Sequence, residues 1–192
     1  MCGVLAVSSF GCRHSPSANN LMVKLMFRPT DDPRDMPAAG VVALSGKSVT
    51  VKVTGDQRPA PLQQIGVNVE ERNPRPVSTP DDVDAFIRSS VEQVLAANGA
   101  RAVPAGAQRV LALKVLTYFV QEGNTYSARV TFAARLTDAA GTTLWEGPMA
   151  GSYNHWGHSF DEQTYLEALS NATMDAVKSL LGTPAFAQAA AG

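Results

Sequence analysis

The spacing of apolar residues after Arg109 constrains the fold of this chain more than any other feature. From that residue the apolar pattern has a period of two, with Leu111, Leu113 and Val115 on one face. A second run follows the tight connection at 122–124, and its apolar face consists of Tyr126, Ala128, Val130, Phe132, Ala134 and Leu136. Such alternation is typical of strands in a sheet that buries one face, which favours antiparallel pairing.

A third strand is predicted to extend this meander. Residues 138–141 have the composition of a hairpin turn, because Gly141 tolerates a positive φ. Residues 142–153 then form the strand. Gly147-Pro148 is expected to be a bulge or a break in it, since proline cannot donate to the ladder.

Two segments have the period of an amphipathic helix. The first begins at Thr79, which can cap it, and ends at Asn98-Gly99. The second begins at Ser159, which forms a capping-box pattern with Glu162, and ends at Gly182. Each has a single apolar stripe, so both helices need a cover that a one-sided sheet can supply.

With a valine-rich strand at 49–53 and a short strand at 65–69, these elements predict the α/β class in its α+β form. The fold is a two-layer sandwich in which a mixed, mostly antiparallel sheet has two helices packed on one face. One domain is expected over 41–182. Proline-rich residues 12–40 are predicted to be a tether, and Ala-rich residues 183–192 a disordered tail.

The first twelve residues are typical of an export signal. Residues 1–11 are apolar or small and resemble a secretory signal segment. The Gly11-Cys12 junction resembles a bacterial lipobox, so Cys12 is the predicted lipidation site. Its acyl chains would contribute about 0.8 kcal/mol per buried CH₂. The alternative is an ordinary apolar N-terminus on a cytosolic protein. No apolar run reaches the roughly 18 residues that a membrane-spanning helix needs.

Composition excludes several functional classes. A formal net charge of -1 leaves no broad basic field for a nucleic acid backbone. The two cysteines are Cys2 and Cys12, so the domain has neither a disulfide framework nor a cysteine-based metal site. A nucleophile elbow and a Gly-rich phosphate loop are both missing from the sequence, and no cofactor is implied. We therefore expect no enzyme activity.

Two sets of polar residues are candidates for binding a partner or ligand. Asp56 and Arg58 follow the end of a predicted strand, and the alternative is a local ion pair that closes a turn. Arg129, Thr131 and Arg135 share the polar face of the second alternating run. If that face is open, it is a natural surface for a partner; the alternative is that it is simply solvated.

His155 and His158 flank Trp156-Gly157 and are candidate ligands for zinc or copper. A site needs three or four ligands, and Asp161 and Glu162 are the nearby groups that could add to them. A metal-binding protein or metal-dependent enzyme using the two histidines is therefore the alternative function. The other interpretation is a loop in which Trp156 packs and both histidines face water.

Several landmarks occur together: the valine-rich strand, Asp56-Gln57-Arg58, Ile65-Gly66, a helix closing on Asn98-Gly99, the 111–136 hairpin, and Trp145-Glu146-Gly147 before a last helix. This set resembles the YajG family of uncharacterised bacterial lipoproteins over about residues 45–181. More distantly, the layout is similar to the N-terminal domain of TolB, to lipoprotein activators of penicillin-binding proteins, and to auxiliary lipoproteins of lipid-transporting ABC systems.

The resemblance implies an outer-membrane lipoprotein with no assigned chemistry, and the distant relatives imply a binding role. We therefore expect a lipid-anchored, non-enzymatic binding or assembly module that faces the periplasm. Its expected partners are the membrane, through the lipid on Cys12, and an envelope protein complex.

Overall fold

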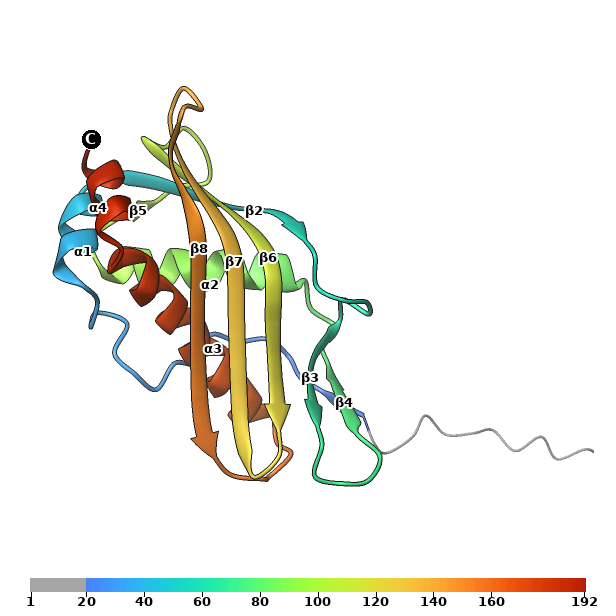
Figure 1. Cartoon of the computed structure of the whole chain (residues 1–192). Coiled ribbons are helices and arrows are strands. Elements are labelled where there is room, and N and C mark those ends of the chain that lie inside the picture. The colour runs from blue at the N-terminus through green and yellow to red at the C-terminus, as the bar shows by residue number, and fades with distance from the viewer. Residues whose placement is uncertain (1–19) are drawn as a thin grey trace, which may run out of the picture.

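The computed structural model describes residues 20–192 and arranges them in two layers, a sheet and a set of helices (Figure 1). The strands are β1 (Leu21–Met22), β2 (Ser48–Asp56), β3 (Gln64–Asn68), β4 (Arg75–Ser78), β5 (Arg101–Ala102), β6 (Arg109–Glu122), β7 (Thr125–Asp138) and β8 (Thr143–Trp156). The helices are α1 (Ala38–Leu44), α2 (Val83–Ala97), α3 (Glu162–Leu181) and α4 (Pro184–Ala191). A mixed sheet covered by helices confirms the predicted α+β sandwich.

Three strands of 14 residues, β6, β7 and β8, form an antiparallel meander. Leu111 lies opposite Leu136, and Phe132 lies opposite Met149. All four side chains are buried, so the two-residue period identified the inner face correctly.

Two shorter strands share the other edge of β6. Strand β2 pairs with residues 109–115 and β3 with residues 120–122, and both run parallel to β6. Residues 57–63 connect them and project away from the sheet (Figure 1). Strand β4 adds to β3 antiparallel, while β1 and β5 add short parallel pairings to β4 and β2.

Helices α2 and α3 lie behind the sheet in the view of Figure 1 and cover its inner face. Their N-caps are Asp82 and Asp161, whose carboxylates each accept a bond from the N–H three residues on, at 3.0 Å. The predicted caps, Thr79 and Ser159, are therefore wrong. An aspartate closer to each helix offers the same acceptor, and Ser159 hydrogen-bonds to Asp161 instead.

The chain's last residues are not a disordered tail, because Pro184–Ala191 form α4. Phe186 is fully buried, and its ring centroid lies 5.3 Å from that of Trp145 in an edge-to-face contact. The Lys47 ammonium donates to the carbonyl of Ala190 at 2.8 Å. Alanine favours the helix, and one aromatic side chain supplies the anchor.

The predicted tether is also wrong for residues 20–40, which pack on the domain. Val23 is fully buried. The N–H of Arg28 donates to Ser170 Oγ at 2.9 Å, and the N–H of Thr30 donates to Asn171 Oδ1 at 3.0 Å. Proline prevents regular structure here, and side chains of α3 accept the hydrogen bonds of the extended backbone's N–H groups instead. Residues 12–19 lie outside the described part of the chain.

Strand β8 continues in register through Gly147-Pro148, where a bulge or a break was predicted. Pro148 pairs in register with Ala133 of β7. The N–H of Ser152, four residues on and therefore on the same side as the Pro148 nitrogen, donates to Asp175 Oδ2 at 2.9 Å and not to β7. The nitrogen of Pro148, which carries no hydrogen, thus faces the free edge of β8. No strand of residues 20–192 pairs there, so the missing N–H costs no hydrogen bond between strands.

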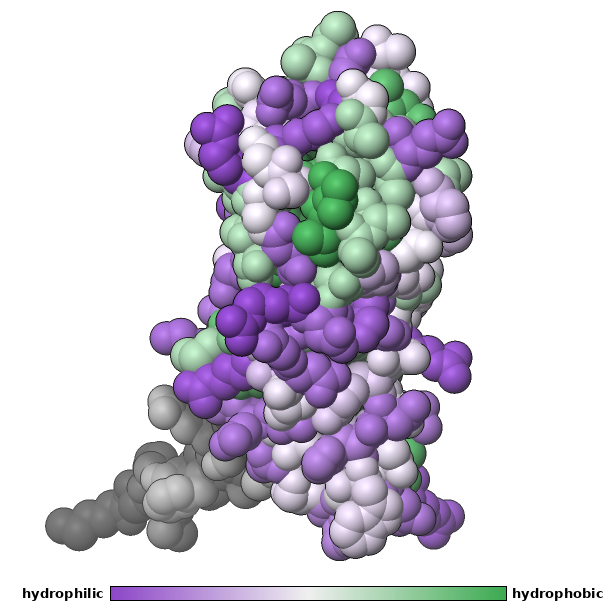
Figure 2. All heavy atoms as spheres, turned by 90° about the vertical axis from the view of Figure 1, so that its left-hand side faces the viewer, coloured by the Kyte–Doolittle hydropathy of each residue, from purple (hydrophilic) through white to green (hydrophobic). Residues whose placement is uncertain are grey.

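The side of the molecule where α1 and α4 lie, on the left of Figure 1, carries an apolar patch. Seen from that side, hydrophobic side chains gather over α1 and α4, and polar ones cover most of the lower half (Figure 2). Val42 of α1 is 74% exposed. Within residues 20–192, none of the helices has the length and apolar character needed to cross a membrane.

Candidate functional site

The outer face of the sheet, onto which Figure 1 looks, has no helix of residues 20–192 upon it. Arg129, Thr131 and Arg135 of β7 all lie on this open face, because the residues that alternate with them are buried on the other. Arg135 forms an ion pair with Glu146, directly opposite on β8. The three residues predicted from the sequence therefore share one surface.

Apolar side chains occupy the middle of the open face in a shallow hollow of about 520 Å³. Leu116 of β6 is 38% exposed there. The side chains beside it include Ala112, Ala133 and Pro148, together with the charged groups of Lys114, Arg135 and Glu146. An apolar centre with charged surroundings is typical of a surface that a protein partner covers.

Leu116 was not among the residues predicted from the sequence. It follows Val115, and two neighbouring apolar residues break the two-residue period. The register of β6 against β7 shifts between Val115 and Thr117, which is a β-bulge. Leu116 faces outward by the alternation itself, as Lys114 does, and the bulge returns Tyr118 to the inner face. An apolar residue at an outward position was therefore the available signal.

A second hollow, of about 400 Å³, adjoins the first at Leu116. It lies between β6 and the 57–63 connection, and its walls include Arg58, Pro59 and Phe119. The apolar surface therefore continues from the middle of the sheet to the place where β2 ends and β3 begins.

Asp56 and Arg58 form a buried ion pair at the base of that connection. The Arg58 guanidinium donates to both carboxylate oxygens of Asp56, at 3.0 Å from Nε to Oδ1 and 2.6 Å from Nη2 to Oδ2. Nη2 also donates to the carbonyl of Leu62 at 2.8 Å. The two side chains are only 5% and 9% exposed. Their geometry is that of a local pair that fixes a turn.

The pKa values of two carboxyl groups near the 57–63 connection depend on Arg58. Burial alone would raise the pKa of Asp56, but hydrogen bonds from the side chain and backbone of Arg58 outweigh it and hold that pKa below its ordinary value. Burial, followed by the charges of Asp56 and Asp82, raises the pKa of Asp84. Arg58 thus favours the charged forms of two carboxylates, Asp56 at the end of β2 and Asp84 in the first turn of α2.

The two histidines lie in separate pairs. His155 Nδ1 is 3.9 Å from Glu167 Oε1, and His158 Nδ1 is 3.9 Å from Glu70 Oε1. Among residues 20–192, no three His, Cys, Asp or Glu side chains gather where they could hold a metal ion. The metal-binding alternative gains no support from this geometry. Trp156, predicted to pack in this loop, is instead 77% exposed.

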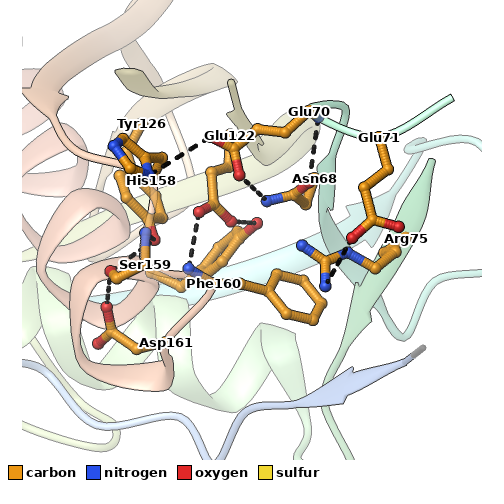
Figure 3. A network of polar contacts seen from close by, with 11 residues as sticks. Asn68, Glu70, Glu71, Arg75, Glu122, Tyr126, His158, Ser159, Phe160 and Asp161 are labelled. Carbon is orange, nitrogen blue, oxygen red and sulfur yellow. Dashed lines mark hydrogen bonds and ion pairs between the residues drawn. The ribbon is translucent and has the colours of Figure 1, made fainter. Parts of the chain in front are cut away.

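A buried carboxylate that sequence reasoning missed lies at the end of β6 (Figure 3). Glu122 is fully buried and accepts hydrogen bonds from the Tyr165 hydroxyl and the Phe160 N–H, both at 2.7 Å. Phe160 has a φ of 47°, which is rare for a bulky residue, and the Arg75 guanidinium lies 3.9 Å from its ring centroid. Glu122 therefore fixes the loop that leads β8 into α3.

The remaining groups of this network also bond to one another. The hydroxyls of Tyr126 and Ser159 are 3.0 Å apart, and Ser159 also bonds to Asp161. Burial, and then the hydrogen bond to Glu122, raises the pKa of Tyr165, so its phenol stays a donor at neutral pH. Both oxygens of Glu122 have protein donors, which is the arrangement of a structural clamp.

Removing the phenol tests that role. We expect Tyr165→Phe to lower the free energy of unfolding by about 1–3 kcal/mol, because a fully buried carboxylate oxygen loses its donor. Urea denaturation followed by circular dichroism at pH 7 measures the loss. Tyr153→Phe is the matched control, since its hydroxyl donates at 3.1 Å to the partly exposed Glu167. Equal losses in the two variants would contradict the clamp.

The predicted lipidation site, Cys12, lies outside the described residues, and its place in the function is a matter of proposal.

Comparison with known proteins shows the fold. No family model matches the sequence, and no curated protein is significantly similar to it. The crystal structure of a Xanthomonas campestris protein of the DUF330 family is 14% identical, with a TM-score of 0.55, and the match covers 84% of this chain and 92% of that one. At this identity, the likeness shows a common fold.

Two bacterial proteins named as lipoproteins give weaker matches. A candidate lipoprotein from Caulobacter crescentus is 17% identical, with a TM-score of 0.44 over 66% of this chain and 91% of that one. A minor lipoprotein from Acinetobacter baumannii is 13% identical, with a TM-score of 0.39 over 70% of this chain and 89% of that one.

Proposed function

We propose that this chain is a lipoprotein of the bacterial envelope that binds a partner protein through the open face of its sheet. The observation that carries the proposal is the uncovered apolar hollow around Leu116, with Lys114 and Arg135 beside it. A partner that covers this surface removes apolar area from water, which lowers the free energy of the complex.

The lipid anchor is proposed from the sequence. Cys12 follows a short apolar segment, and two or three acyl chains on it would hold the protein durably at a membrane. Residues 12–19 connect this cysteine to the described domain, and at about 3.5 Å per residue they span about 28 Å at most. A domain held so close to a membrane meets partners that are themselves at that membrane, which is why we propose an envelope complex.

The finer placement follows the resemblance to the YajG lipoproteins, which favours the outer membrane and a domain that faces the periplasm. We propose binding without catalysis. Two buried carboxylates support this role, because Asp56 is satisfied by Arg58 and Glu122 by Tyr165. Such pairs stabilise a scaffold.

Replacement of Cys12 tests the anchor. In cells of its native host, we expect the wild-type protein to sediment with membranes and to carry acyl groups on Cys12 by mass spectrometry. Cys12→Ser should move at least about nine-tenths of the protein to the soluble fraction, because the acyl chains supply the membrane affinity.

Cys2→Ser is the matched control, since Cys2 lies in the segment that processing would remove. It should stay acylated and membrane-bound. An unmodified Cys12 on wild-type protein that begins at Met1 would overturn the proposed anchor.

A further inference from the structure

The open face has a charge opposite in sign to that of the whole chain. The charged side chains that β2, β6, β7 and β8 present on this side are Lys52, Lys114, Arg129, Arg135 and Glu146. These four cations and one carboxylate give the face a net charge of +3, whereas the chain carries a formal net charge of -1. The rest of the molecule is therefore acidic.

The pairing register places these charges around the apolar hollow. Lys52 pairs with Ala112 of β6, which lies opposite Arg135 of β7. Lys114 lies opposite Ala133, the hollow's apolar neighbour on β7. The cations thus extend over three adjacent strands with the apolar groups of the hollow between them.

Three of the cations form no ion pair with any residue of the described domain. Among the ion pairs of residues 20–192, Arg135 is paired with Glu146, while Lys52, Lys114 and Arg129 are paired with nothing. Exposed cations elsewhere, such as Lys24, Arg72 and Arg88, are also outside these ion pairs, so the grouping of cations around one apolar hollow is what distinguishes this face. Unpaired cations of one sign around an apolar centre are complementary to an acidic surface that carries an apolar side chain.

Resting on the proposed function, we infer that the partner presents an acidic protein segment to this face. An apolar side chain of that segment occupies the hollow beside Leu116, and its carboxylates face Lys114, Arg129 and Lys52. A protein segment fits better than a lipid headgroup layer, because the centre of the site is an apolar hollow of about 520 Å³ rather than a cluster of cations alone.

Selection from a random peptide display library on the immobilised full-length chain tests this inference. We expect the enriched peptides to carry net negative charge and at least one large apolar residue. The most enriched peptide is then synthesised with a fluorophore, and its affinity is measured by fluorescence anisotropy. Enrichment of neutral or basic peptides, or of none, would overturn the inference.

Charge reversal on the protein gives the second readout. Lys114→Glu combined with Arg129→Glu should weaken binding of the selected peptide at least about tenfold, and raising the salt from about 50 mM to about 500 mM should weaken wild-type binding. Lys24→Glu with Arg34→Glu is the matched control, because both residues are exposed away from the open face. It should change the affinity less than about twofold.

Two further variants separate this inference from the proposed function. Leu116→Asp should abolish peptide binding, and Val42→Asp, at an exposed residue of α1, should not. If Leu116→Asp abolishes binding but the charge reversals do not, the open face is a binding site and the acidic partner is wrong. If Leu116→Asp has no effect, both fail. Tighter binding to phosphatidylglycerol vesicles than to any selected peptide, lost in Leu116→Asp, would also overturn the acidic protein partner.

Discussion

Gly151→Ala is expected to destabilise this protein by more than about 3 kcal/mol, beyond the usual range for an overpacked core. A Cβ at this residue of β8 would lie 2.2 Å from both the Ala172 carbonyl oxygen and the Ala176 nitrogen of α3. These are backbone atoms of a long helix and cannot rotate away. The helix must therefore move off the sheet, and the packing of the core is lost with it. Urea denaturation at pH 7 measures the effect.

Gly55→Ala is the matched control for this substitution. Gly55 also lies in a strand, but a Cβ there would have no heavy atom within 4 Å. We expect a change of no more than about 1 kcal/mol, since only the backbone preference differs. A Gly151→Ala variant as stable as Gly55→Ala would show that α3 does not lie against β8 as described.

Arg58→Ala is expected to cost about 3–5 kcal/mol, because it leaves the carboxylate of Asp56 buried without its cation. The Asp56 side chain is 9% exposed, and the variant also loses the bond from Arg58 to the Leu62 carbonyl. The 57–63 connection should then lose its fixed geometry, and with it one wall of the hollow beside Leu116. Chemical denaturation gives the stability, and the affinity of the selected peptide reports on the wall.

The chain contains a matched control for this pair. Arg34 and Asp32 have the same spacing, and their guanidinium–carboxylate bond is 2.7 Å, but their side chains are 76% and 49% exposed. Arg34→Ala should cause no measurable loss, because solvent screens the charges. Similar losses in the two variants would mean that burial does not decide the strength of the pair.

The pH dependence of Arg58→Ala follows from the lowered pKa of Asp56. A carboxyl whose pKa is depressed by folding contributes stability above its unfolded value, here 3.8, and that stability is lost as the pH falls through the folded value. Without Arg58, burial raises the pKa of Asp56, so the variant's carboxyl takes up its proton above pH 3.8 and that of the wild type below it. The difference in stability between wild type and Arg58→Ala should therefore be full near neutral pH, begin to shrink above pH 3.8 and continue to shrink below it. A difference that grows with acidity would contradict the pairing.

Local sequence patterns predicted the parts of the fold that depend on one segment at a time. The alternation after Arg109 identified the inner face of β6 and β7, and the helical periods identified α2 and α3. The parallel pairing of β2 and β3 with one edge of β6 was beyond such patterns. Alternation specifies which face of a strand is buried, but it does not determine which strand pairs with it or in which direction.

Errors arose where a distant part of the chain decides the structure. The Ala-rich tail forms α4 because Phe186 packs against Trp145. The proline-rich segment is held by hydrogen bonds to Ser170 and Asn171 of α3. Neither partner is close in sequence, so composition alone indicated disorder. Glu122 was missed for the same reason, since its donors come from the loop before α3 and from α3 itself.

The candidate site was predictable in part. Arg129, Thr131 and Arg135 were placed on one face by their spacing, and the structure has them there. The pairing of Asp56 with Arg58 was among the stated alternatives, whereas its burial depends on the 57–63 connection folding over it. Leu116 could have been found from the sequence, because the alternation that buries Leu113 and Val115 places this apolar residue on the outer face.

Site-specific photo-crosslinking in the native host tests most directly whether the open face is where this lipoprotein meets its partner. A benzophenone amino acid replaces Leu116 in one variant and Val42 in another, each with Cys12 intact. We predict a discrete crosslinked envelope protein from residue 116, none from residue 42, and loss of the crosslink when Cys12→Ser is added. A crosslink from residue 42 but not from residue 116 would contradict the assignment of the binding face.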